Sequence, residues 1–352
     1  MPAAIPTSRR PSRFRLYLPF ILLGLLVVGW SAAWFYIRSR TTEGMDKWLA
    51  AEAAQGRNWT CADRTIGGYP FRIELSCKSL AFERSDLTAT LGRVVAITQI
   101  YKPGHIIIEA AGPLRATGAN TTVESTWRLL QASVILSGRE FERLALVADA
   151  PVVRAVSPDT GSIEVTAKEF EVHARPDPKD SDMVDLAFSA EGAVLPGLDA
   201  LVGGTEPSDL DLVLRLSRAT QLAAGGGPRV VERWRLAGGQ VEIDRLRIVK
   251  GPRRVEATGN ASIDDLRRPQ GRLDAQVAGI EGLLGQFIGD KAGIAGNLLG
   301  ALLGQSQRGA QIAQPADPKA PRLKPLPPVR IDNGRLFVGP LQLPNMRIPA
   351  LY

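Results

Sequence analysis

The chain has 352 residues, of which 45% are hydrophobic and 22% charged, and its formal net charge is +7. This composition is typical of a folded protein and excludes an intrinsically disordered chain. The positive charge lies at the start: residues 1–40 hold six arginines and no acidic residue, which leaves 37 basic and 36 acidic residues in the remainder. A body that binds nucleic acid would need a basic excess of its own, so nucleic acid is not an expected partner.

A long uncharged segment follows the first arginines. Leu16 to Ile37 is 22 residues without a charge, and a helix of about 20 residues crosses the hydrocarbon core of a bilayer. Four arginines precede this segment and two follow it, so the positive-inside rule predicts that residues 1–15 are cytoplasmic and that the bulk of the chain is outside. We predict a single-pass anchor at residues 16–37 in a bacterial inner membrane, with a periplasmic body. Cleavage near Ser31-Ala32-Ala33, as in a secretory signal, stays open as the alternative.

The two cysteines bracket a predicted β-hairpin. Residues 60–66 and 71–78 have strand character and are joined by Gly67-Gly68-Tyr69-Pro70. If Ile66 faces Arg72 across the turn, Cys61 lies directly opposite Cys77, within disulfide range. A Cys61–Cys77 disulfide would agree with an oxidising compartment such as the periplasm. Two free buried thiols are the alternative.

Beyond residue 56 the dominant hydrophobic pattern has a period of two residues. Alternating segments occur at residues 163–168, 186–190, 209–216 and 272–277. Turn signals separate such segments, and this alternation predicts antiparallel strands with one apolar and one polar face. We therefore expect a mainly β fold: one transmembrane helix, a short helix over residues 41–55, and a large antiparallel β-rich domain over residues 38–304, shaped as a curved sheet or groove.

One or two amphipathic covering helices are predicted from Gly279 to Gly304, where the hydrophobic residues follow helical spacing and seven glycines form a stripe on the other side. Two interpretations stay open: the helix covers the sheet, or it contacts lipid. The candidate lipid-contacting residues are Leu283, Leu284, Phe287, Leu298 and Leu302. The prolines of residues 305–328 predict an extended linker, and residues 329–352 predict a closing hairpin with its turn at Asn333-Gly334.

The residues that carry catalysis or bind metals do not form a recognisable motif. The chain has only two histidines, His105 and His173, and lacks the spacings typical of zinc sites, phosphate-binding loops and serine hydrolases. Gly225-Gly226-Gly227-Pro228 is not a dinucleotide-binding motif, because a proline follows the glycines and no helical period begins there. We expect no cofactor, no metal and no enzymatic activity. A hydrolase built on paired carboxylates stays open, since such pairing is spatial.

Two short motifs resemble known bacterial proteins. The segment Gly67-Gly68-Tyr69-Pro70-Phe71-Arg72, together with the closing segment Asn333 to Pro340, resembles a family of single-pass envelope proteins built on a domain of unknown function. Gly238 to Ile243 and Glu256 to Ile263 resemble, more distantly, the C-terminal strands of AsmA-like proteins. The second resemblance implies a β-rich groove anchored in the inner membrane and associated with lipid handling or upkeep of the outer membrane. Neither resemblance implies a catalytic residue.

These features together predict a non-enzymatic protein, anchored in the inner membrane, that binds lipid or acyl chains or supports the cell envelope. A structural module that binds other envelope proteins through its sheet edges is the alternative.

Overall fold

The structure is a computed structural model. It describes residues 13–118, 120–138, 140–158, 161–197, 199, 204–222, 228–279 and 323–352.

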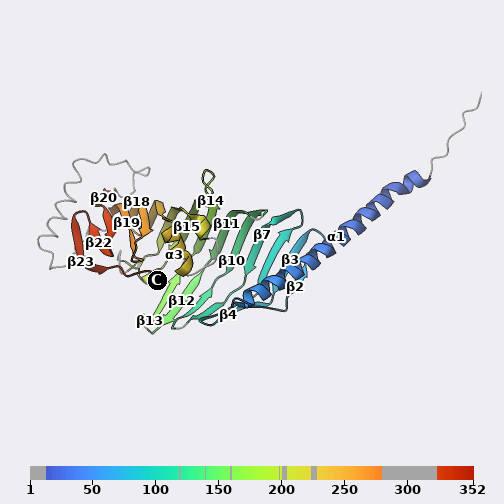
Figure 1. The fold of residues 1–352 in the computed structure, drawn as a ribbon, viewed down its shortest axis with the longest axis horizontal. Coiled ribbons are helices and arrows are strands. Elements are labelled where there is room, and N and C mark those ends of the chain that lie inside the picture. Colours follow the sequence, from blue (N-terminus) through green and yellow to red (C-terminus); the bar gives the residue numbers. More distant parts are fainter. Residues whose placement is uncertain are drawn as a thin grey trace, which may run out of the picture.

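The described chain opens with one long helix, α1 (Arg13–Ala53), which projects from one end of a β-rich body (Figure 1). Its apolar part is long and uncharged enough to cross a membrane, as predicted. The helix expected over residues 41–55 is present as far as Ala53, but as the continuation of α1. Residues 38–53 contain no proline and only one glycine, Gly44, so nothing ends the helix between them. The chain leaves the helix through Gly56, whose φ is +73°.

The body consists of two antiparallel sheets, and the prediction of a mainly β fold is confirmed. The short sheet contains β1 (Asn58–Ala62), β4 (Ser79–Arg84), β5 (Leu87–Leu91), β8 (Leu114–Gly118), β9 (Thr122–Thr126), β12 (Val152–Ser157) and β13 (Gly161–Thr166), in that order. The long sheet begins with β2 (Thr65–Gly67), β3 (Arg72–Cys77), β6 (Val94–Gln99), β7 (Lys102–Ala110), β10 (Leu129–Ser137), β11 (Glu140–Asp149) and β14 (Glu169–Pro176). It continues with β15 (Val184–Ala193), β16 (Ser208–Leu216), β17 (Val241–Lys250), β18 (Arg253–Ile263), β19 (Pro269–Ala278), β21 (Val329–Asp332), β22 (Arg335–Val338) and β23 (Leu341–Arg347).

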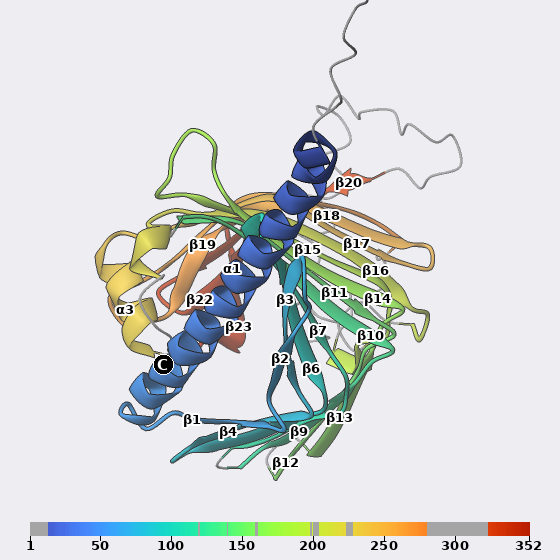
Figure 2. The same cartoon turned by 90° about the vertical axis from the view of Figure 1, so that its right-hand side faces the viewer.

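The chain alternates between the two sheets, one hairpin at a time, so the sheets share a line of crossing segments that we call the spine. Successive crossings are hydrogen-bonded to each other: Ala111 N to Arg93 O (2.7 Å), Arg128 N to Asp149 O (2.9 Å) and Ala150 N to Lys168 O (2.7 Å). Figure 2 shows the result from one end, with the sheets as two walls that diverge from this line. We call the space between the walls the trough.

The hairpin predicted around the cysteines has a different register. Ile66 lies opposite Leu75, not Arg72, and Cys61 belongs to the short sheet, where it faces Leu80 of β4. Cys61 is nevertheless bonded to Cys77 of β3, with their Cα atoms 5.2 Å apart. The prediction of the register is wrong because it treated residues 60–66 as one strand, whereas the chain changes sheet between β1 and β2. The disulfide therefore joins the two walls of the trough at one end.

One further expectation is corrected in the C-terminal half. A helix does begin after the glycines of residues 225–227: α3 (Pro228–Leu236), with proline at its first position, where the missing N–H costs nothing. Val230 and Trp234, one turn apart, form its buried side. Within the predicted extended linker of residues 305–328, Lys324–Pro325 forms a short strand, β20, beside β19. A 3₁₀ turn, η1 (Ala219–Gln221), follows β16.

The closing hairpin is confirmed. β21 pairs with β22 with Asp332 opposite Arg335. The turn residues Asn333 and Gly334 have φ values of +52° and +69°, the left-handed conformation that this residue pair favours in two-residue hairpins.

Candidate functional site

The trough is lined by a hydrophobic row that crosses the long sheet. Side chains of register partners lie on the same face of a sheet, and eleven neighbouring strands contribute one hydrophobic partner each. In strand order they are Leu75, Ala96, Ile108, Ala132, Leu146, Val172, Phe188, Leu212, Leu246, Ala257 and Ala275. At about 4.8 Å per strand the row is roughly 48 Å long.

This row is not packed as a core. Of its eleven members only Ala257 is buried, and the other ten are half-buried. In the part of the chain that the structure describes, the one cluster of buried hydrophobic residues is Trp34, Ile66 and Ile73, where α1 lies on the first strands of the long sheet. A protein interior normally buries such residues at crystal-like density. The middle of the trough is therefore an apolar surface without a protein partner among the described residues.

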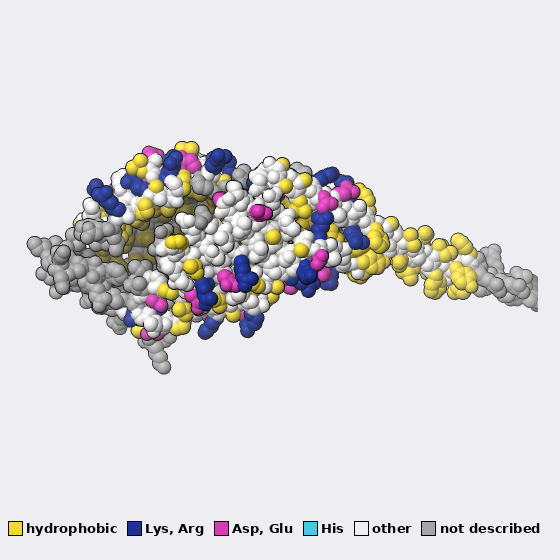
Figure 3. All heavy atoms as spheres, turned by 90° about the horizontal axis from the view of Figure 1, so that it is seen from below, with side chains coloured by type: hydrophobic (Ala, Val, Ile, Leu, Met, Phe, Trp, Pro, Cys, Tyr) yellow, Lys and Arg dark blue, Asp and Glu magenta, His cyan; other side chains and the backbone are white. Residues whose placement is uncertain are grey.

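A cavity of about 390 Å³ lies in this middle part, where the end of the short sheet faces β14 to β17. Its lining contains no charged side chain; the larger hydrophobic members are Val153, Val165, Phe170, Phe188, Leu195, Leu210, Leu212 and Leu246. This volume falls within the usual range of small-molecule sites. Viewed from below, the molecule has a hollow with hydrophobic side chains inside it (Figure 3).

The opposite face of the long sheet is polar. Arg175 pairs with Asp185 at 3.1 Å, and Arg215 pairs with Asp244 at 2.8 Å, beside a shallow polar depression of about 510 Å³. Both histidines lie on this face: His105 contacts Ser133, and His173 contacts Glu171 at 2.9 Å. Among the described residues no group of His, Cys, Asp or Glu could hold a metal ion. The strand alternation thus gives the long sheet a charged outer face, whereas its inner face is hydrophobic around the cavity and holds the buried Lys250 at one end.

The motif Gly68-Tyr69-Pro70-Phe71-Arg72 is a loop that lies against α1. The indole nitrogen of Trp34 donates a hydrogen bond to the Arg72 carbonyl (3.0 Å), and that of Trp30 donates to the Pro70 carbonyl (2.8 Å). Gly68 has a φ of +100°, and a Cβ there would come within 2.7 Å of the Arg72 carbonyl oxygen, so the loop requires glycine at this position. The motif therefore joins the anchor to the first strands of the long sheet.

A buried polar cluster lies at one end of the inner face. Lys250 is 1% exposed and its ammonium group donates to Asp199 (2.6 Å) and to the Glu206 carbonyl. Its register partner Ser208 is fully buried, and the Ser208 hydroxyl has no hydrogen-bond partner in the described structure. Neither the Lys250 nor the Ser208 side chain is accessible to a substrate, so we interpret the cluster as a structural contact between β16, β17 and the segment that contains Asp199 and Glu206. The sequence offered no sign of it, since the pairing partners are more than 40 residues apart.

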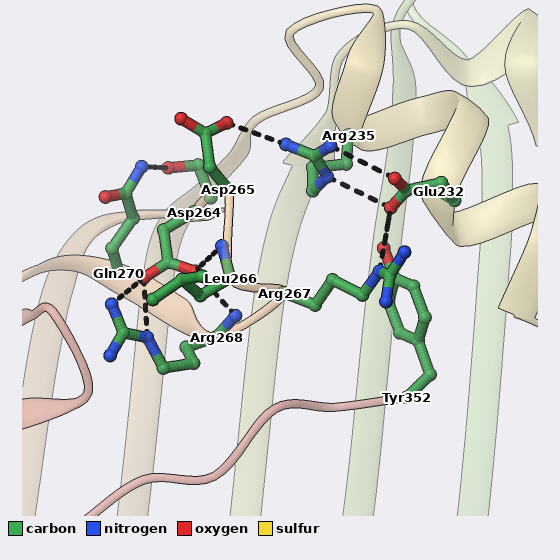
Figure 4. Close-up of polar contacts among 10 residues, drawn as sticks. Glu232, Arg235, Asp264, Asp265, Leu266, Arg267, Arg268, Gln270 and Tyr352 are labelled. Atoms are coloured by element: carbon green, nitrogen blue, oxygen red, sulfur yellow. Dashed lines mark hydrogen bonds and ion pairs between the residues drawn. The ribbon is translucent and has the colours of Figure 1, made fainter.

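A second polar network fastens the last residues of the chain (Figure 4). Arg235 of α3 donates to both carboxylate oxygens of Glu232 (3.0 and 3.1 Å), and the Tyr352 hydroxyl donates to Glu232 at 2.7 Å. These two donors, Arg235 first, lower the pKa of Glu232 from its usual 4.5 to about 2. Burial and the neighbouring Glu232 carboxylate raise the pKa of Tyr352. The network joins α3, the β18–β19 turn through Arg267, and the segment after β23.

The predicted lipid-contacting residues Leu283, Leu284, Phe287, Leu298 and Leu302 lie outside the described residues, as does most of the predicted Pro-rich linker. The sequence interpretation missed the contact between the motif and the anchor. Trp30 and Trp34 were available as a signal, since a tryptophan that becomes buried usually finds a hydrogen-bond partner for its indole N–H.

Residues 34–346 match a protein family described as an uncharacterized protein conserved in bacteria, DUF2125. No curated protein and no solved structure matches the chain. The matched region begins in α1, at the tryptophan that contacts the motif loop, and ends in β23, so it includes both walls of the trough and both cysteines. The chain belongs to this family of uncharacterized bacterial proteins, DUF2125.

Proposed function

We propose that this protein is a non-enzymatic membrane-anchored protein that holds acyl chains in its trough. The observation that carries the proposal is the half-buried hydrophobic row across eleven strands, with an uncharged cavity at its centre. Burial of apolar surface is worth about 25 cal/mol per Å². Soluble proteins rarely leave apolar patches larger than a few hundred Å² exposed, and larger ones mark binding surfaces.

Acyl chains fit this surface better than other apolar ligands for two reasons. The row is long and narrow, and a chain of methylene groups can lie along it without presenting a polar group to the uncharged lining. The body is also attached to a helix long and apolar enough to cross a bilayer, so membrane lipids are close by. The resemblance of two C-terminal segments to AsmA-like proteins, which implies lipid handling, stays a prediction in the same direction.

The proposed compartment is the periplasm of a bacterial cell, with the anchor in the inner membrane and the N-terminus in the cytoplasm. The four arginines before the apolar segment support this orientation. The Cys61–Cys77 disulfide supports an oxidising environment for the body.

Mass spectrometry of an organic extract of the gently solubilised full chain tests the proposal, together with titration of a fluorescent fatty acid. We expect bound phospholipid or fatty acid in the wild type. Leu212→Asp, which places a carboxylate on the inner face, should weaken probe binding at least tenfold, since an unpaired charge in an apolar site costs several kcal/mol. Val213→Asp is the matched control: the neighbouring residue points to the polar outer face, beside the outer depression, and should bind as the wild type does.

Ala190→Phe provides an independent variant that adds no charge. Ala190 lines the cavity, and a phenyl ring there would fill part of it. We expect reduced uptake of the fatty acid while the disulfide and the β-sheet circular dichroism persist. A wild-type chain that carries no lipid and takes up no acyl probe would refute the proposal.

If the chain binds no acyl chains, the alternative function is a module that binds other envelope proteins through a sheet edge. β13 is the terminal strand of the short sheet, and beyond it only the Thr166–Val194 bridge is formed among the described residues. An exposed edge of this kind can add a strand from a partner.

A further inference from the structure

Exposed aromatic side chains gather at the corner of the body next to the anchor. Outside α1, the aromatic residues with large exposure among the described residues are Tyr69 (51%), Phe71 (62%), Tyr101 (65%) and Phe141 (36%). Tyr69, Phe71 and Tyr101 lie at this corner. Tyr101 is placed there by its neighbour Ile100, whose backbone N–H donates a hydrogen bond to the Phe71 carbonyl at 3.1 Å. Aromatic residues with a polar atom are enriched at membrane interfaces.

The motif loop, residues 67–72, is fixed to the side of α1. The Tyr69 ring contacts Trp34 edge-on at 5.5 Å, and the Tyr69 hydroxyl is hydrogen-bonded to Ser31 at 2.8 Å. The Phe71 ring lies 6.1 Å from Trp30. These contacts, added to the indole hydrogen bonds of Trp30 and Trp34, hold the loop on the last turns of the apolar segment.

These helix positions belong to the apolar part of α1, which is long and uncharged enough to cross a membrane. The uncharged segment ends at Ile37, before Arg38 and Arg40. If Leu16 to Ile37 is centred in a hydrocarbon core of about 30 Å, Trp34 lies roughly 4 Å inside its edge and Trp30 deeper, at 1.5 Å per residue. In that placement, a loop fixed to Trp34 and Trp30 would extend from the bilayer interface into the outer part of the hydrocarbon core.

Irregular backbone at membrane depth needs internal hydrogen bonds, and four carbonyls of the loop have them. The carbonyl of Gly68 accepts from Arg72 N, that of Phe71 accepts from Ile100 N, and those of Pro70 and Arg72 accept from the two indoles. Pro70 has no N–H to satisfy. The charged end of Arg72 is bound to Glu74 at 3.0 Å and can extend toward water.

We propose that the motif loop is a second membrane-contacting element, inserted beside α1 into the interface of the leaflet on the side of the body. The loop and the anchor together hold the first strands of the long sheet at the bilayer surface and restrict the tilt of the trough. A helix alone would leave the body free to swing about Ala53. This inference does not depend on what the trough binds.

Site-directed spin labelling of the full chain in phospholipid vesicles tests the proposal. Both native cysteines are in the disulfide, so Phe71→Cys introduces one reactive thiol. Leu266→Cys, 65% exposed in the β18–β19 turn, is the matched control. We expect the label at position 71 to be accessible to oxygen and protected from a water-soluble nickel complex, as a label at Leu25 in α1 should be, and the label at position 266 to show the reverse.

A second measurement needs no substitution in the loop. Vesicles that contain a phospholipid with a photoreactive diazirine in its acyl chain are irradiated with the wild-type chain, and the cross-linked peptides are identified by mass spectrometry. We expect cross-links to the peptide that contains Tyr69 and Phe71, and none to the β18–β19 turn. Equal water accessibility of the labels at positions 71 and 266, or cross-links to α1 without any to the loop peptide, would overturn the proposal.

Discussion

At the scale of single residues, the least exposed charge in the described structure is that of Lys250, and it defines the first prediction. Its ammonium group is held by Asp199 and a backbone carbonyl. Removal of one partner from a buried ion pair leaves an uncompensated charge, whereas replacement of both partners by apolar residues is often tolerated. We expect Lys250→Met to lower the free energy of unfolding by about 3 kcal/mol, near the low end for buried pairs because the Asp199 side chain is 24% exposed.

Denaturant unfolding of the detergent-solubilised full chain, followed by tryptophan fluorescence, measures this loss. The double variant Lys250→Met/Asp199→Leu is the control and should recover part of the stability. A single variant as stable as the wild type would show that the pair contributes little.

The pH response of Glu232 is the second prediction at this scale. Its folded pKa of about 2 lies below the usual 4.5. The carboxylate therefore stabilises the fold above about pH 4.5, and this contribution is lost as the pH falls from 4.5 toward 2. We expect the segment that ends at Tyr352 to loosen in that window. The amide of Leu351, bonded to the Arg267 carbonyl, should lose protection from hydrogen exchange once corrected for the intrinsic pH dependence.

Tyr352→Phe provides the control for the pH prediction. This variant removes one donor to Glu232, so the folded pKa should move up toward 4.5 and the acid-dependent part of the protection should shrink. An unchanged titration of Glu232 in the variant, measured by NMR, would contradict the assigned cause.

At the scale of elements, the Cys61–Cys77 disulfide joins β1 of the short sheet to β3 of the long sheet. The cysteines are 16 residues apart, and a loop of this size is worth about 3 kcal/mol in the chain-entropy model. We expect Cys61→Ala/Cys77→Ala to lower the free energy of unfolding by about that amount. A thiol reagent under denaturing, non-reducing conditions should label neither native cysteine, and quantitative labelling of both would refute the disulfide.

At the scale of the whole molecule, the proposed orientation yields a topology prediction. A reporter that works only outside the cytoplasm, fused after Tyr352, should be active, because four arginines precede the apolar segment and two follow it. A reporter that works only in the cytoplasm should be inactive at the same position. Replacement of Arg9, Arg10, Arg13 and Arg15 by glutamine is the control and should reduce the activity of the first reporter. The opposite pair of activities would reverse the proposed orientation.

The sequence predicted local structure correctly where a two-residue hydrophobic alternation or a turn motif specifies it. Alternation at residues 209–216 and 272–277 corresponds to β16 and β19, and Asn333-Gly334 forms the closing turn. The uncharged run of residues 16–37 predicted the apolar helix. The sequence patterns did not predict α3, because this nine-residue helix shows its helical period through only two buried residues, Val230 and Trp234.

Tertiary structure alone decided how these elements combine. The same alternation is compatible with one curved sheet or with two walls, and the choice depends on where the chain crosses the spine, for example at Gly92, where a Cβ would meet the Ala111 carbonyl at 2.6 Å. The cysteines were paired correctly from a wrong register, since both strand ends lie at the same crossing. The row from Leu75 to Ala275 and the contact of the motif with Trp30 and Trp34 join residues far apart in the chain. A periodic pattern determines which face of each strand is apolar, but only the packing of distant strands determines whether that face is filled.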